Sequence, residues 1–156
     1  ALRPPPPPGI CPEQSAQGMI SVMAPAGTWS DAECAQPIGP ECLTGELIGL
    51  ADNDPLGEIV VAACEAQDVQ PVFRTVVQTY QIARSLVEAG AGTAVLDPFT
   101  AASAAPGKVQ RRQWAPAMPV QLYLLTASHA PLSHGARELA NCIGATARAC
   151  LERGCA

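Results

Sequence analysis

The sequence is short of charged side chains, and basic ones are the scarcest. Charged residues make up 15% of its 156 residues, and 9 Lys and Arg stand against 14 Asp and Glu, for a formal net charge of −5 at pH 7. A protein that grips nucleic acid neutralises phosphates with a basic face. The only dense basic group here consists of Lys108, Arg111 and Arg112. The composition therefore argues against direct DNA contact by these residues.

Long apolar runs and a recognisable export signal are missing as well. The apolar stretches are broken within about ten residues, whereas a membrane-spanning helix needs roughly 18 to 20 apolar residues. Residues 1–3 run straight into the prolines at 4–8, and polyproline does not form the helical apolar region of a secretory signal. We therefore expect a cytoplasmic chain without membrane contact, or a fragment without its own start, since residue 1 is not Met.

The cysteines do not form a metal motif. They number seven, and none stands in a Cys-x-x-Cys pair: Cys11, Cys34, Cys42, Cys64, Cys142, Cys150 and Cys155. A zinc site needs closely spaced cysteines with histidine at ligand spacing, but His129 and His134 have no cysteine near them in the sequence. We expect free thiols in a reducing compartment, with no metal and no cofactor.

Residue sets for catalysis are absent too. A Ser or Cys nucleophile needs a base and an orienting group, yet neither a Gly-x-Ser-x-Gly motif nor a protease-like Cys signature occurs. Gly90 and Gly92 resemble part of a dinucleotide fingerprint, but they follow a predicted helix and precede a strand, the reverse of the required order. For His129 and His134 a solvated or capping role is typical. We therefore expect no enzyme activity.

What the sequence does contain is an apolar share of 48%, enough for a core, and an alternation of strand and helix patterns. Residues 1–19 are rich in Pro, Gly and Gln and favour a polyproline II or disordered lead-in, either a spacer or a ligand for an SH3-like domain. After a short strand at 20–24, the pattern predicts strands at 46–51, 72–77, 93–96, 109–114 and 120–125, with helices at 54–64, 80–89 and 132–152. This order indicates an α/β fold with a parallel sheet and right-handed crossovers.

Ligands of such sheets bind beyond the carboxyl ends of the strands, where loops enter helices. Three predicted loops, at 51–54, 78–81 and 97–100, meet this condition. Their candidate ligand-binding residues are Asp52, Asn53, Asp54, Thr79, Tyr80, Gln81, Asp97, Phe99 and Thr100. Ordinary structural roles compete at several positions: Asp54 as a helix N-cap, Asp97 as a turn former before Pro98, and Phe99 as a packing residue.

Three segments within 45–132 resemble a known family: GELIGLADNDPLG (45–57), YQIARSLVEAGAGTAVLDPFTA (80–101) and MPVQLYLLTASHAPLS (118–133). They are similar to the effector-binding region of LysR-type transcriptional regulators. The segment 89–99, with Ala-Gly-x-Gly before a strand that ends in Asp-Pro-Phe, is most similar to the branch that responds to lysine and opines. Tyr80 stands where this resemblance leads us to expect a small hydroxyl residue.

The resemblance implies a periplasmic-binding-protein-like fold of type 2, in which two α/β subdomains hold an effector between them. Residues 20–45 would then contain a crossover strand and an irregular segment, 46–110 most of the second subdomain, and 111–156 the return strand and a helix of the first. The DNA-binding helix-turn-helix and the start of the first subdomain would be missing, so that contact with DNA would run through an N-terminal domain outside this chain. Family members commonly form homo-oligomers.

Two functions are compatible with this reading. The first is an effector-sensing domain that binds a small polar, amino-acid-like or opine-like molecule, with Asn53, Gln81 and the Asp97 loop taking part. The alternative is a structural remnant or oligomerisation module that keeps the fold without binding an effector.

Overall fold

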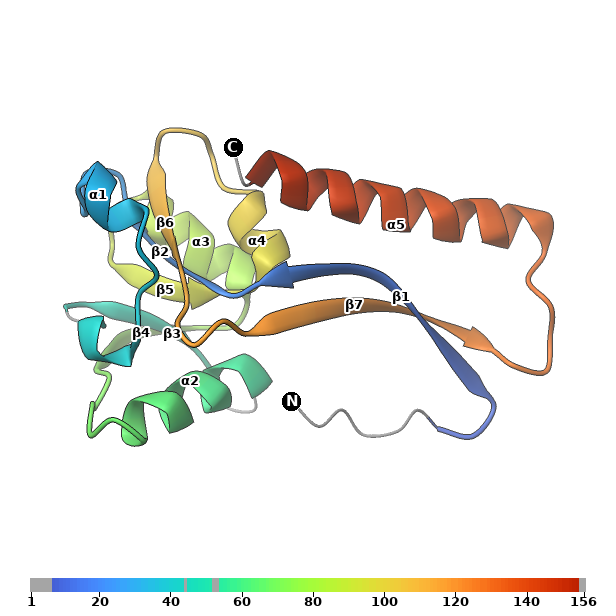
Figure 1. The fold of residues 1–156 in the computed structure, drawn as a ribbon, viewed down its shortest axis with the longest axis horizontal. Coiled ribbons are helices and arrows are strands. Elements are labelled where there is room, and N and C mark those ends of the chain that lie inside the picture. The colour runs from blue at the N-terminus through green and yellow to red at the C-terminus, as the bar shows by residue number, and fades with distance from the viewer. Residues whose placement is uncertain (1–6, 44, 52–53, 155–156) are drawn as a thin grey trace. The chain divides into compact units, whose positions relative to one another are not determined.

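A computed structural model describes residues 7–43, 45–51 and 54–154 of the chain (Figure 1). The chain divides into two compact units, one formed by residues 1–17 and 121–156 and the other by residues 18–120. Among the described residues, no helix combines the length and the apolarity that crossing a membrane requires.

The unit of residues 18–120 is built on a mixed sheet of five strands, in the order β4-β3-β5-β2-β6. Its strands are β2 (Ser21–Pro25), β3 (Leu47–Leu50), β4 (Phe73–Val77), β5 (Thr93–Leu96) and β6 (Val109–Gln113). β3 runs parallel to β4 and β5, as the alternating pattern predicts. β2 runs antiparallel to both β5 and β6, so the sheet is not parallel throughout.

Helices cover both faces of this sheet because successive strand residues point to opposite sides. The helices are α1 (Asp31–Cys34), η1 (Pro40–Cys42), α2 (Pro55–Glu65), α3 (Tyr80–Glu88) and α4 (Pro98–Ala102). Val22 belongs to the core cluster that includes Val60 and Cys64 of α2. Its neighbour Met23 belongs to a second cluster, with residues of α3. Figure 1 shows α2 and α3 on the two sides of the sheet.

The other unit pairs two long strands, β1 (Ile10–Met19) and β7 (Pro119–Ala127), with the helix α5 (His134–Gly154). Within it, the Arg148 guanidinium donates a hydrogen bond to the backbone oxygen of Ser15, at 2.7 Å. Two large apolar side chains of α5, Leu139 and Ile143, are 61% and 40% exposed.

β1 corrects, for residues 10–19, the expectation that residues 1–19 form a polyproline II or disordered lead-in; residues 1–6 lie outside the described part of the chain. Most of its side chains are exposed, and Ala16 is the one described residue of β1 that is buried. Backbone pairing with β7 therefore holds this strand without a buried face. A strand of that kind has no hydrophobic period of two to reveal it in the sequence.

Two further elements depart from the expected boundaries. β6 crosses the expected division between residues 110 and 111 and lies wholly in the five-stranded sheet. Residues 20–43, expected to be a crossover strand with an irregular tail, contribute β2, α1 and η1 to the same unit. The assignment of the units to subdomains of a family fold stays a prediction.

Candidate functional site

Three helices begin at the same edge of the sheet. α2 follows β3, α3 follows β4 and α4 follows β5, and these three strands are neighbours in the order β4-β3-β5. Because the strands are parallel, their carboxyl ends point the same way and the helix N-termini gather there. We call this place the carboxyl edge; it consists of Asp54, Thr79, Tyr80, Gln81 and residues 97–100.

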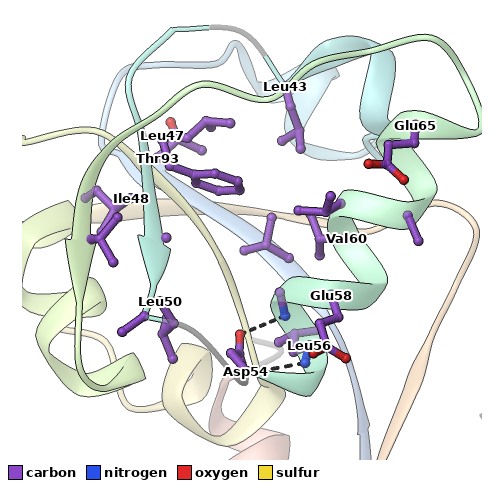
Figure 2. A pocket seen from close by; sticks show the side chains of 18 residues that line it. Leu43, Leu47, Ile48, Leu50, Asp54, Leu56, Glu58, Val60, Glu65 and Thr93 are labelled. Atoms are coloured by element: carbon purple, nitrogen blue, oxygen red, sulfur yellow. Dashed lines mark hydrogen bonds between the residues drawn. The ribbon is translucent and has the colours of Figure 1, made fainter.

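Asp54 is the N-cap of α2. Its carboxylate accepts hydrogen bonds from the backbone N–H of Leu56 at 3.4 Å and of Gly57 at 2.7 Å (Figure 2). It also accepts a hydrogen bond from the hydroxyl of Tyr80, at the start of α3. The expected N-cap role of Asp54 is therefore confirmed. The same carboxylate joins the first turns of two helices.

The three candidates on the β4–α3 loop differ in exposure. The side chain of Thr79 caps α3 by accepting a hydrogen bond from the backbone N–H of Ile82 at 3.3 Å. Gln81 is exposed in the first turn of the same helix. Tyr80 is half-buried and packs beside the core cluster on the α3 face. Within the described part of the chain, the backbone N–H groups of Tyr80 and Gln81 donate no hydrogen bond. These two groups are free to meet an anionic atom.

Asp97 caps α4 in the same manner as Asp54 caps α2. Its Oδ1 accepts hydrogen bonds from the backbone N–H of Phe99 at 2.9 Å and of Thr100 at 3.0 Å. Asp97-Pro98 thus starts a short helix, where the sequence suggested a turn. Phe99 is half-buried, whereas Thr100 is only 5% exposed, which leaves little of its side chain at the surface.

Two carboxylates set the electrostatics of the carboxyl edge. Burial raises the pKa of Tyr80 most, followed by its hydrogen bond to Asp54 and the negative charges of Asp54 and Asp97. Tyr80 therefore stays a neutral hydrogen-bond donor at physiological pH. An acidic rim next to free backbone N–H groups is suited to a small molecule that carries both an amine and a carboxylate.

Two of the candidates, Asp52 and Asn53, lie outside the described residues.

The sequence pattern also missed a cavity of about 530 Å³ between α2 and the strands β3, β4 and β5 (Figure 2). One signal for it was available in the sequence: α2 has a second stripe, at positions 58, 61, 62 and 65, in addition to the one that enters the core. Ile59 of α2 is 37% exposed.

Metal-ligating groups do not gather in the part of the chain that the structure describes. The six described cysteines are all free. Cys64 is buried on the core-facing side of α2. Burial, and to a smaller degree the negative charge of Glu65, raises the pKa of its thiol.

Comparison with known proteins adds a family to this geometry. A family model described as the LysR substrate binding domain matches residues 2–148. No curated protein matches the sequence.

Solved structures show the same fold at low sequence identity. HinK, a LysR family transcriptional regulator from Pseudomonas aeruginosa, has a TM-score of 0.64 and 17% identity, with 94% of this chain and 51% of HinK covered. The CcmR regulatory domain of Synechocystis in complex with 2-PG has a TM-score of 0.69 and 14% identity, with 95% and 72% covered. The effector binding domain of QuiR in complex with shikimate has a TM-score of 0.61 and 15% identity, with 90% and 68% covered.

This chain therefore spans about half the length of HinK. The family match covers nearly all of it, and the mixed α/β sheet with helices on both faces agrees with the fold of these neighbours. The chain belongs to the family of LysR substrate-binding domains.

Proposed function

We propose that this chain is the effector-sensing part of a LysR-type transcriptional regulator and that its carboxyl edge binds a small amino-acid-like or opine-like molecule. The family is one of effector domains of transcriptional regulators. The convergence of three helix N-termini with the carboxylates of Asp54 and Asp97 is the observation that supports the edge as the site. Two solved neighbours carry small molecules, 2-PG in CcmR and shikimate in QuiR.

The proposed ligand follows from the charges at this edge. An ammonium group fits beside Asp97, while a ligand carboxylate fits the free backbone N–H groups of Tyr80 and Gln81. The Ala-Gly-x-Gly and Asp-Pro-Phe segments at 89–99 support the lysine and opine branch of the family. Asp52 and Asn53 belong to the proposed site as sequence candidates.

In a whole regulator, ligand binding would favour one conformation of the sensing domain and thereby alter how a homo-oligomer presents its DNA-binding domains. The DNA-binding domain, the cytoplasmic location and the oligomer are parts of this proposal. The acidic balance of the chain, with a net charge of −5, supports a sensing role apart from DNA.

Titration calorimetry with lysine, arginine and octopine tests the proposal. The informative variant is Asp97→Asn, because Asn also caps helices but carries no charge. We expect Asp97→Asn to weaken binding by about tenfold or more, since a charge-assisted hydrogen bond is lost.

The matched control is Asp68→Asn, which removes the same charge at an exposed position. Asp68 has a φ of 55°, a left-handed conformation that Asn tolerates well. Asp68→Asn should bind as the wild-type chain does. Equal binding by wild type and Asp97→Asn, or the absence of binding to the whole panel, contradicts the proposal.

A second candidate function, an association module, is favoured by one observation. β4 is an edge strand of the five-stranded sheet, and apolar side chains are exposed on or beside it. Val72 is 63%, Phe73 36% and Val76 58% exposed. Exposed apolar edges promote pairing with another chain. Native mass spectrometry discriminates between the two functions. A wild-type dimer that becomes a monomer in Val76→Arg supports the association module, whereas a monomer that binds ligand argues against it.

A further inference from the structure

The cavity beside α2 has the size of a small-molecule site. Its volume is about 530 Å³, within the range of about 300 to 1,000 Å³ that such sites occupy. It lies on one face of the sheet, between α2 and the strands β3, β4 and β5 (Figure 2). Leu43, Leu47, Ile48 and Leu50 contribute to a lining that is largely apolar.

The cavity is open because α2 uses only one of its two stripes for the core. Val60 and Cys64 are 1% and 0% exposed, and both belong to the cluster that contains Trp114. Glu58, Val61, Ala62 and Glu65, at helical spacing, form the second stripe, and all of them line the cavity. The core stripe anchors the helix and also reaches the cavity at Val60, and the second stripe extends the cavity lining.

The opposite wall carries aromatic and branched side chains that lack cover. A Cβ built on Gly49 would lie 2.7 Å from Cδ1 of Phe73, which shows that this ring lies against the glycine of β3. Phe73 and Val76 both line the cavity, and they remain 36% and 58% exposed. Covering such apolar surface gains about 25 cal/mol per Å². The wall therefore favours an apolar ligand.

The charged groups of the lining have one sign. They are Asp54, Glu58 and Glu65, and the lining contains neither Lys nor Arg. Asp54 is occupied by its bonds to Leu56, Gly57 and Tyr80. Among the described residues, no group forms an ion pair or a side-chain hydrogen bond with Glu58 or Glu65.

Glu65 is also placed unfavourably for the helix itself. It stands at the C-terminal end of α2, where the helix dipole is negative, and the last turn of α2 has no basic residue. A cation bound there relieves this repulsion. Phe73 and Val61 line the same cavity as Glu58 and Glu65, so one site offers apolar surface together with carboxylates.

We propose that this cavity binds an apolar molecule that carries a protonated amine. This site lies between α2 and the sheet and borders the carboxyl edge at Asp54, whereas the contacts proposed for the carboxyl edge come from Asp97 and the start of α3. Its carboxylates repel anionic ligands of the same shape, so it discriminates amines from acids.

Two naphthalene probes of matched shape test which sign of ligand charge the cavity favours. 1-Naphthylmethylamine is a cation at neutral pH, and 1-naphthylacetic acid is an anion. We expect the amine to bind to the wild-type chain about tenfold more tightly than the acid, measured by the change in naphthalene fluorescence. Equal binding of the two probes, or binding of neither by the folded chain, overturns the proposal.

Paired variants test the location. Glu58→Gln/Glu65→Gln should bring the affinities for amine and acid together, whereas the control Glu138→Gln/Glu152→Gln, which removes two exposed charges from α5, should leave the difference intact. Ala62→Trp, which fills the cavity from α2, should abolish binding of the amine, with circular dichroism confirming the fold. An unchanged preference for the amine in Glu58→Gln/Glu65→Gln overturns the proposal.

Two more outcomes separate this site from its neighbours. Asp97→Asn and an excess of lysine should leave binding of the naphthyl amine unchanged, whatever happens to lysine binding itself. Displacement of the amine by lysine would place it at the carboxyl edge and overturn the proposal. A dimer that excludes the amine would also overturn it, because a second copy of the chain would then cover the Val76 wall.

Discussion

At the scale of single residues, Tyr80 stands out because its hydroxyl joins two helix starts. It donates a hydrogen bond to the carboxylate of Asp54, which lies 26 residues earlier in the sequence. The sequence pattern predicted the N-cap role of Asp54 from Asp-Pro alone, since a cap depends only on neighbouring residues. The bond to Tyr80 escaped prediction because it depends on β3 and β4 being neighbours in the sheet.

We expect Tyr80→Phe to lower the free energy of unfolding by about 1 to 2 kcal/mol, the cost of removing a donor from a partly buried carboxylate. Urea unfolding at pH 8 measures this difference. Tyr123→Phe is the comparison, because it makes the same chemical change at the other tyrosine of the chain. A loss no larger than that of Tyr123→Phe would contradict the role given to Tyr80.

The raised pKa of Tyr80 adds a dependence on pH. In the unfolded chain, tyrosine loses its proton near pH 10, whereas the folded chain keeps it to higher pH. The stability due to Tyr80 is therefore fully present below about pH 10 and decreases as the pH rises above it. The difference between wild type and Tyr80→Phe should shrink between pH 9 and pH 11. A constant difference contradicts this account.

At the scale of elements, Gly92 allows β5 to start beside β3. Its φ is 147°, and a Cβ there would lie 2.5 Å from the backbone oxygen of Glu46. That same oxygen accepts a hydrogen bond from the backbone N–H of Thr93 at 2.9 Å. The Gly-x-Gly that resembled a nucleotide motif thus has a structural role in the approach of two strands.

Gly92→Ala should therefore cost about 2 to 4 kcal/mol, because a side chain there meets both an unfavourable backbone conformation and a clash with backbone. Gly90→Ala provides the control: its φ is 84°, and nothing lies within 4 Å of the added Cβ. It should cost only about 1 kcal/mol, the conformational part. Thermal unfolding of both variants measures the difference, and equal losses would show that the close approach to Glu46 is unimportant.

Element prediction succeeded where one face is buried and the ends carry clear signals. The strand at 93–96 was located to the residue, and the helices α2 and α3 were placed within a residue or two of their ends. β1 was missed because its pairing uses the backbone and leaves its side chains exposed. α4 was missed because five residues are too few to show a helical period.

At the scale of the whole molecule, the order and direction of the strands could be predicted only in part. Strand, helix and strand in succession require parallel neighbours, and β3, β4 and β5 obey this rule. Nothing in the residues of β2 marks it as antiparallel to β5, because side-chain alternation is the same in both directions. The family resemblance supplied the class of fold, and the family match bears it out.

The carboxyl edge follows from the same topology. Once β3, β4 and β5 are parallel neighbours, Asp54, Tyr80 and Asp97 must come to one edge, and the sequence order alone predicted this gathering. The cavity under α2 could not be predicted in that way, since it depends on how far a helix stands from the sheet. That distance is set by side-chain packing.

The function proposed for the carboxyl edge is the binding of an amino-acid-like molecule. Backbone amide NMR during a titration with lysine or octopine tests it most directly, because the resonances report position as well as binding. We expect concentration-dependent shifts centred on the amides of Tyr80, Gln81 and Phe99, with the amides of α5 unchanged. Shifts confined to residues away from the starts of α2, α3 and α4, or no shifts at all at millimolar ligand, would contradict it.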